Sequence, residues 1–253
     1  MQINATFATT ATAGEEQAVA TAINYIDSIY NVDENVTFDM TFGTAKLGAG
    51  TAGENTASFY NVSYSALEGA LYAKDSAPGS TPVQQAAAAS LPTSDPTGGT
   101  GHFYVTEAYG RMLGLSGIPA ASASAPDATV DLNSSLNYTY TSAGGSTGST
   151  IAAGTYDAVG VLEHEITEAL GRSDIGGANT FGDGADYSSL DLFRYTAAPS
   201  TAGVQPTGTS VGHRDEPFDP NYKVNDQSYF SYNGSTVTLP YDSGIRRRRR
   251  RHR

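Results

Sequence analysis

Large apolar side chains are scarce in this chain, and this scarcity limits the folds that it can adopt. Leu, Ile, Val and Phe supply 44 of the 253 residues, about 17%, a level at which disorder becomes a serious alternative. Sixteen tyrosines add aromatic surface that a core can bury, and a net charge of −12 is modest for the length. We therefore expect a folded domain with Tyr-rich sheets and long loops of Gly, Ser and Thr.

The basic residues are concentrated at the C-terminus. Seven of the 14 Lys and Arg residues lie in segment 246–253, and without it 7 basic residues face 26 acidic ones, a net charge of −19. An acidic body repels nucleic acid and anionic lipid, so we expect neither nucleic acid nor a membrane as a partner. We interpret segment 246–253 as a purification tag. The alternative is a basic tail that binds nucleic acid or a membrane surface.

Further classes of protein are excluded by what the chain lacks. It has no cysteine, which excludes a disulfide scaffold, a cysteine-ligated zinc or iron–sulfur site and a thiol nucleophile. No apolar stretch approaches the roughly 18 residues of a transmembrane helix. No signal peptide stands at Met1. Because the composition resembles that of secreted bacterial proteins, we expect a secreted protein whose signal peptide has been removed, with a cytosolic protein as the alternative.

Hydrophobic periodicity and turn residues predict a mixture of helices and strands. The predicted helices are 15–30, 64–74, 81–91, 107–115 and 156–170. The predicted strands are 36–42, 102–106, 130–140 as a strand or hairpin, and a C-terminal hairpin of 228–232 and 236–239 with its turn at Asn233 and Gly234. Residues 43–53 are expected to form a flexible loop. Because helices and strands do not alternate strictly, we predict the α+β class.

The segment 164–174, HEITEALGRSD, combines a histidine with carboxylates at a spacing that suits a metal site. In an α-helix residues four apart share a face, so His164 and Glu168 can aim at one point and Glu165 can reach a group bound there. The zinc-peptidase signature H-E-x-x-H uses this geometry, with two ligands and the Glu as general base. Here a glutamate stands at the second ligand position, and carboxylates are accepted zinc ligands. The alternative is a surface histidine on a solvated acidic face.

The same segment resembles the metzincin signature H-E-x-x-H-x-x-G-x-x-H/D. Gly171 and Asp174 match it, whereas Glu168 departs from it. The resemblance implies a zincin-like α+β fold with a mixed sheet, an active-site helix and a C-terminal β-hairpin. It also implies zinc held by His164, Glu168 and Asp174, with Glu165 as general base in the cleavage of a peptide substrate.

A second segment, SLDLFRY at 189–195, agrees with this resemblance. Metzincins place a tight turn with a buried Met beneath the metal after the helix. This chain has no Met after Met112, and Leu190 or Leu192 would form that floor here. Tyr195 would stand near the metal as a second catalytic residue. His213 is a rival third ligand. Together, the two segments also resemble a group of predicted secreted bacterial proteins of unsettled function.

We expect one zincin-like domain over 1–245, with the active-site helix and the C-terminal part in 155–245 and the other helices and sheet strands in 1–154. Zinc is the expected metal, and because carboxylate-rich sites suit harder ions, Ca²⁺ and Mn²⁺ are alternatives. Residues 182–186, GDGAD, resemble a short calcium loop. A structural Ca²⁺ is therefore a further candidate, with an ordinary Gly/Asp turn as the alternative.

These observations predict a secreted, metal-dependent peptidase in which a metal-activated water hydrolyses a peptide bond. Two other functions stay open. The composition and the departure at Glu168 suit an extracellular structural, adhesive or self-assembling protein on a degenerate, catalytically inactive zincin-like fold. The Gly/Asp loops suit a Ca²⁺-stabilised binding domain.

Overall fold

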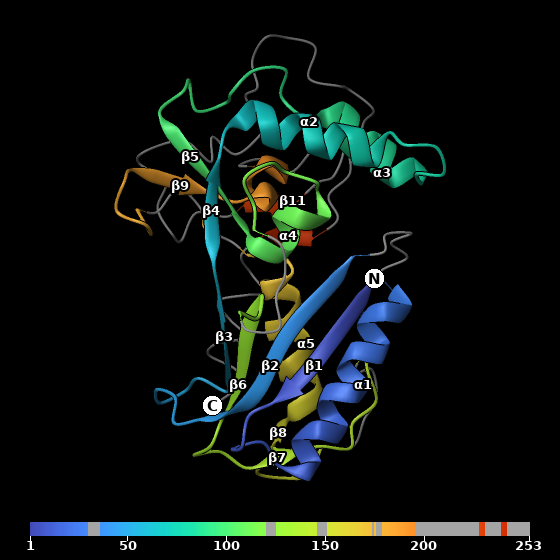
Figure 1. The fold of residues 1–253 in the computed structure, drawn as a ribbon, viewed down its shortest axis with the longest axis vertical. Helices are drawn as coiled ribbons and strands as arrows, with labels where there is room; N and C mark the ends of the chain where they lie inside the picture. Colours follow the sequence, from blue (N-terminus) through green and yellow to red (C-terminus); the bar gives the residue numbers. More distant parts are fainter. Residues whose placement is uncertain are drawn as a thin grey trace.

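The computed structural model describes residues 1–29, 36–119, 125–145, 151–173, 175 and 179–193, and the backbone of 194–195, 228–230 and 239–241. These residues form a mixed α+β structure, as predicted. The elements fall into two groups, each around its own hydrophobic cluster (Figure 1). Within the part of the chain that the structure describes, none of the helices has the length and apolar character that crossing a bilayer requires.

The first group is built on a four-stranded mixed sheet in the order β1-β2-β6-β3. Strands β1, β2 and β6 are parallel, whereas β3 runs antiparallel to β6 at the edge. Their bounds are β1 Gln2–Phe7, β2 Thr37–Ala45, β6 Ala128–Asn133 and β3 Gly53–Ala57. In β2 the alternating Phe38, Met40 and Phe42 are fully buried, which confirms the strand predicted at 36–42.

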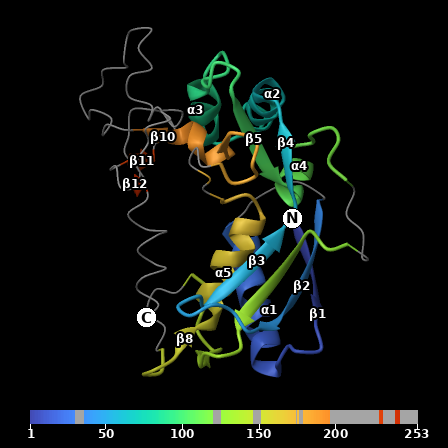
Figure 2. The same cartoon turned by 90° about the vertical axis from the view of Figure 1, so that its left-hand side faces the viewer.

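Two helices, α1 (Ala13–Ile29) and α5 (Ala158–Ala169), lie side by side against one face of this sheet (Figure 2). Each presents an apolar stripe to the sheet, as helical spacing of small and branched side chains dictates. The fully buried stripe residues are Ala18, Val19, Ala22 and Ile26 in α1 and Val159, Leu162 and Ile166 in α5. The helices predicted at 15–30 and 156–170 are therefore confirmed. Helix α1 begins two residues before the predicted start, and α5 begins two residues after it, because Tyr156–Asp157 form strand β8, paired with β7 (Tyr138–Thr139).

Helix α5 ends as its sequence predicts. Gly171 adopts a φ of +106°, which favours glycine. Its N–H donates to the carbonyl of Glu168 at 2.9 Å, and the N–H of Arg172 donates to the carbonyl of Thr167 at 2.9 Å. These two bonds form a Schellman motif, which satisfies carbonyls that the helix leaves free. The helix therefore ends at Ala169, one residue after Glu168.

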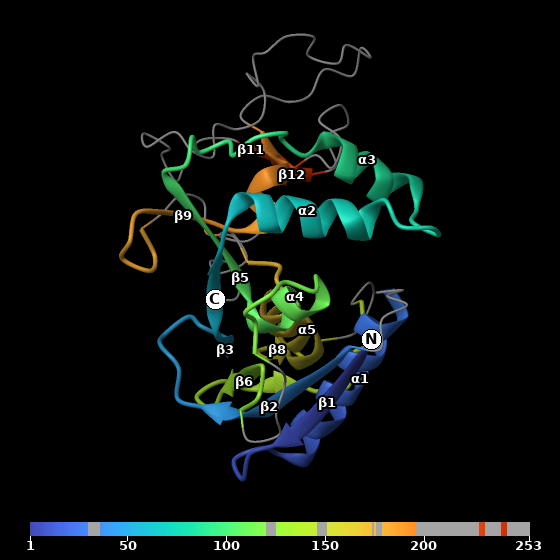
Figure 3. The same cartoon turned by 45° about the horizontal axis from the view of Figure 1, so that its top comes forward.

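The second group contains a three-stranded sheet in the order β4-β5-β9, with helices α2 and α3 beside it (Figure 3). The strands are β4 Phe59–Val62, β5 Gly101–Thr106 and β9 Ala185–Tyr187, and the helices are α2 Tyr64–Asp75, α3 Pro82–Ser90 and α4 Glu107–Met112. Residues Leu67, Phe103 and Val105 are central to its core. The three predicted helices and the strand at 102–106 are confirmed, although α4 ends three residues before the predicted 115.

The sequence interpretation was wrong over residues 43–53. Strand β2 continues to Ala45, and Gly53 begins β3, so only the middle of that segment is a loop. Neither β3 nor β4 was predicted, because the sequence of β3, GENTA, lacks alternating apolar residues. The strand forms through its pairing with β6 and its packing against α5.

The C-terminal elements fall partly within the described residues. Segment 189–195 forms a 3₁₀ helix η1 (Ser189–Phe193) and strand β10 (Arg194–Tyr195). Strands β11 (Ser228–Phe230) and β12 (Leu239–Tyr241) pair antiparallel, so the predicted pairing is confirmed, while residues 236–238 of the predicted second strand lie outside the described residues. The predicted turn at 233–234 and the tail 246–253 lie outside the described residues. The single domain over 1–245 stays a prediction.

Candidate metal centre on helix α5

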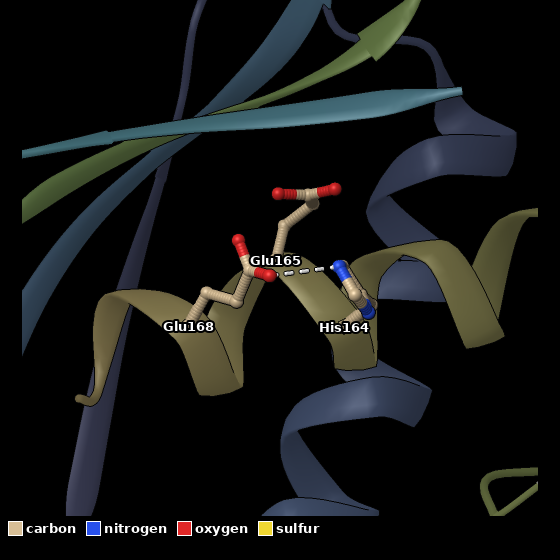
Figure 4. Close-up of side chains that lie close together, drawn as sticks. All are labelled: His164, Glu165 and Glu168. Carbon is tan, nitrogen blue, oxygen red and sulfur yellow. Dashed lines mark ion pairs between the residues drawn. The ribbon is translucent and has the colours of Figure 1, made fainter. Parts of the chain in front are cut away.

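Three side chains of α5 bring their donor atoms close together: His164, Glu165 and Glu168. Each offers a donor atom, and these atoms all lie within 4.8 Å of one another. His164 Nε2 and Glu168 Oε1 are 3.0 Å apart, one helical turn from each other (Figure 4). Glu165 points toward the strands instead. The structure therefore brings together three of the residues that the sequence predicted as a site.

Helix α5 places this cluster at the rim of the first core. The apolar stripe of α5 faces α1 and the sheet, so the cluster falls where the helix meets solvent. The side chains of His164 and Glu168 are 23% and 19% exposed, whereas Glu165 is 8% exposed. An ion or substrate can reach the first two, while the third is shielded from bulk water.

Asn55 of β3 ties two of the carboxylates together. Its Nδ2 donates to Glu165 Oε2 at 2.9 Å and to Glu168 Oε2 at 3.1 Å. Strand β3 can lie close enough to α5 for these two bonds because residue 53 is glycine. A Cβ on Gly53 would lie 2.5 Å from Val161 Cγ1, so only glycine fits there. Sequence reasoning missed Asn55, and no signal in the sequence could have found it, since β3 itself has no strand pattern.

Arg172, just after the helix, sets the tautomer of His164. Its Nη2 lies 3.2 Å from His164 Nδ1 and donates to the His164 carbonyl at 3.0 Å, while its Nε donates to Thr167 Oγ1 at 2.8 Å. A guanidinium only donates, so Nδ1 accepts the bond. In neutral His164 the proton therefore sits on Nε2, which donates to Glu168 Oε1.

The surroundings keep Glu168 ionised. Burial raises its pKa, but the hydrogen bond and charge of His164, the charge of Arg172 and the Asn55 amide together bring the pKa below its ordinary value. Glu163, a further acidic residue of α5, belongs to a different environment. It accepts a hydrogen bond from the N–H of Gly145 at 2.8 Å, and burial raises its pKa.

The donor set fits a small divalent cation. Zinc binds histidine nitrogen and carboxylate oxygen at about 2.0–2.2 Å, and two such ligands of a tetrahedral ion lie about 3.3 Å apart. The observed 3.0 Å between His164 Nε2 and Glu168 Oε1 is close to that spacing. This fit requires a change of tautomer in His164. A metal bound at His164 Nε2 needs the proton on Nδ1, and a protonated Nδ1 cannot accept the hydrogen bond from Arg172.

The other predicted site residues are Asp174, His213, Tyr195 and the apolar floor residues Leu190 and Leu192. Asp174, His213 and the side chain of Tyr195 lie outside the described residues. Leu192, one of the two residues expected to form the apolar floor, is buried in the second hydrophobic cluster, while the buried residues of α5 belong to the first. The third ligand and the second catalytic residue stay predictions.

Searches among protein-family models, curated proteins and solved structures find no match to this chain. The functional conclusion therefore rests on the geometry of this site.

Proposed function

We propose that this protein is a secreted, metal-dependent peptidase on a zincin-like fold. The observation that carries the proposal is the convergence of an imidazole and two carboxylates on one turn of α5, partly open to solvent. A mixed sheet covered by a helix that carries H-E-x-x-E agrees with the arrangement that the resemblance implies. His164 and Glu168 would hold the ion, with a third ligand from the chain after the helix.

The residues of this chain divide the chemistry between them. The bound ion would supply Lewis acidity toward the scissile carbonyl and a water of lowered pKa. Glu165 would serve as the general base toward an attacking water and would pass the proton to the leaving amine. Asn55 holds the carboxylates of Glu165 and Glu168 in fixed orientations through its two hydrogen bonds. Arg172 keeps its bonds to the His164 carbonyl and to Thr167 in either tautomer of the imidazole.

The position of β3 favours an extended peptide as the substrate. Among the described residues β3 pairs on one side only, with β6, so its other edge presents unpaired backbone groups. An extended chain can add to such an edge through main-chain hydrogen bonds. Asn55 comes from the same strand and contacts Glu165. A peptide on this edge would therefore lie close to the general base.

The test compares three variants of α5 for metal content and peptide cleavage. The parent is expected to bind about one transition metal ion per chain by elemental analysis and to cleave a mixture of fluorogenic peptides. Glu165→Gln should retain the metal and lose kcat/KM by about 10²–10⁴-fold, the usual contribution of a general base. Glu168→Ala should lose the metal.

The matched control is Glu163→Gln, on the same helix but bonded to Gly145 rather than to the cluster. It should leave metal content and cleavage unchanged. If Glu168→Ala binds metal as well as the parent does, or if chelators leave cleavage intact, the proposed centre is wrong.

A second candidate is a self-assembling extracellular protein on an inactive fold. It is favoured by the direct bonds of Glu168 to His164 and Asn55, which satisfy these groups without an ion. In that case chelators should leave the melting temperature unchanged, and light scattering should show ordered assemblies. A monodisperse monomer with chelator-sensitive cleavage would exclude it.

A further inference from the structure

The loop before β9 wraps around a buried carboxylate. Asp186 is fully buried, and its Oδ2 accepts the N–H groups of Thr180 at 2.6 Å and Phe181 at 2.7 Å. Its Oδ1 is also buried and receives no hydrogen bond from the described residues. Most buried polar atoms in proteins have a partner, so an uncompensated carboxylate oxygen indicates a missing ligand.

A second carboxylate lies against the first. Asp183, whose side chain is 40% exposed, is within hydrogen-bonding reach of the Asp186 side chain. Its Oδ2 accepts the hydroxyl of Tyr104 at 2.6 Å, and this bond holds the pKa of Asp183 below its ordinary value. The same bond raises the pKa of Tyr104 to about 12, so the phenol stays a donor. Two charged carboxylates in contact repel unless a cation or a proton lies between them.

The nearest histidine does not supply the missing charge. His102 Nδ1 is 3.6 Å from Asp183 Oδ2, but the amide Nδ2 of Asn61 lies 3.0 Å from the same nitrogen. An amide N–H only donates, so Nδ1 accepts and has no proton to offer Asp183. A shared proton would neutralise one of the two carboxylates, whereas a divalent cation neutralises both.

We propose that this loop is a binding site for a hard divalent cation of the Ca²⁺ class, held between the carboxylates of Asp183 and Asp186. Oxygen ligands alone, and charged ones first, are what Ca²⁺ prefers. The exposed side of Asp183 admits the ion and the waters that complete its coordination. The site is independent of the α5 centre, because β9 belongs to the second group of elements, whose core is a separate cluster (Figure 3).

Terbium luminescence is the direct probe, since the chain has 16 tyrosines and no tryptophan and Tyr104 contacts Asp183. Tb³⁺ bound in the loop should be sensitised through tyrosine and displaced by Ca²⁺. The apparent Kd for Ca²⁺ should be about 10⁻⁴–10⁻³ M, as for extracellular sites with few protein ligands. Asp183→Asn and Asp186→Asn should each weaken Ca²⁺ binding at least about tenfold.

Two controls separate this loop from other acidic sites. Asp95→Asn makes the same change in another loop, where the carboxylate accepts the N–H of Thr97, and should leave the affinity unchanged. His164→Ala disables the α5 centre and should also retain Ca²⁺ binding.

The proposal is overturned if Asp183→Asn binds Ca²⁺ as tightly as the parent, or if Zn²⁺ but not Ca²⁺ displaces Tb³⁺. It is also overturned if His164→Ala abolishes the signal while Asp183→Asn keeps it. Asp186→Asn changes a buried group, so its fold is checked by circular dichroism. Asp183, with its exposed side chain, provides the decisive variant if Asp186→Asn fails to fold.

Discussion

Glu15 should make the protein less stable as the pH rises through neutrality. It lies in the first turn of α1, is fully buried, and neither of its carboxylate oxygens has a hydrogen-bond partner among the described residues. Burial raises its pKa from the ordinary 4.5 to about 7. The charges of Asp131 and Glu16 also raise the pKa of Glu15, whereas the nearby backbone of Thr12 lowers it.

The sign follows from proton linkage. The unfolded chain loses the Glu15 proton near pH 4.5, whereas the folded protein keeps it until about pH 7. Between these values the folded state binds more protons, so the free energy of unfolding falls as the pH rises, by at most about 1.4 kcal/mol per unit. From pH 5 to pH 8 the expected loss is about 2–3 kcal/mol.

Glu15→Gln removes the titration but keeps the shape of the side chain. Urea unfolding followed by circular dichroism should show the variant gaining about 2–3 kcal/mol relative to the parent between pH 5 and pH 8. Glu16→Gln, which removes the same charge from the exposed side of the same turn, should show a nearly constant difference. A Glu15→Gln difference that does not change with pH would refute the reasoning.

Two further substitutions test a buried ion pair and the glycine that ends helix α5. Arg111 pairs through Nη1 and Nη2 with the fully buried carboxylate of Asp127 at 2.5 and 2.7 Å. Arg111→Met should therefore lower the free energy of unfolding in urea by about 3–5 kcal/mol, and a loss under 1 kcal/mol would contradict this. Gly171→Ala should lower the melting temperature through a loss of about 1–3 kcal/mol, because its φ is +106° and a Cβ would lie 2.6 Å from the Tyr109 ring. Gly69→Ala, where a Cβ meets nothing within 4 Å, should be neutral or stabilising, and equal effects at both glycines would count against the argument.

The helices and the local part of the site could be predicted from sequence because their causes are local. Helical spacing and the Thr81 capping box lie within a few residues, and α1, α2, α3 and α5 formed where expected. His164, Glu165 and Glu168 converge because one turn of helix brings them together. The third ligand, assigned to Asp174 or His213, stays a prediction, because both residues lie outside the described part of the chain.

Only the tertiary structure decided what surrounds these residues. Asn55 bonds to Glu165 across 110 positions of sequence. It lies in a polar strand that forms only because it pairs with β6 and packs against α5. The burial of Glu15, near Asp131 of β6, likewise depends on elements that are distant in sequence. Local periodicity carries information over one or two turns, whereas desolvation and hydrogen bonding depend on which segments meet in space.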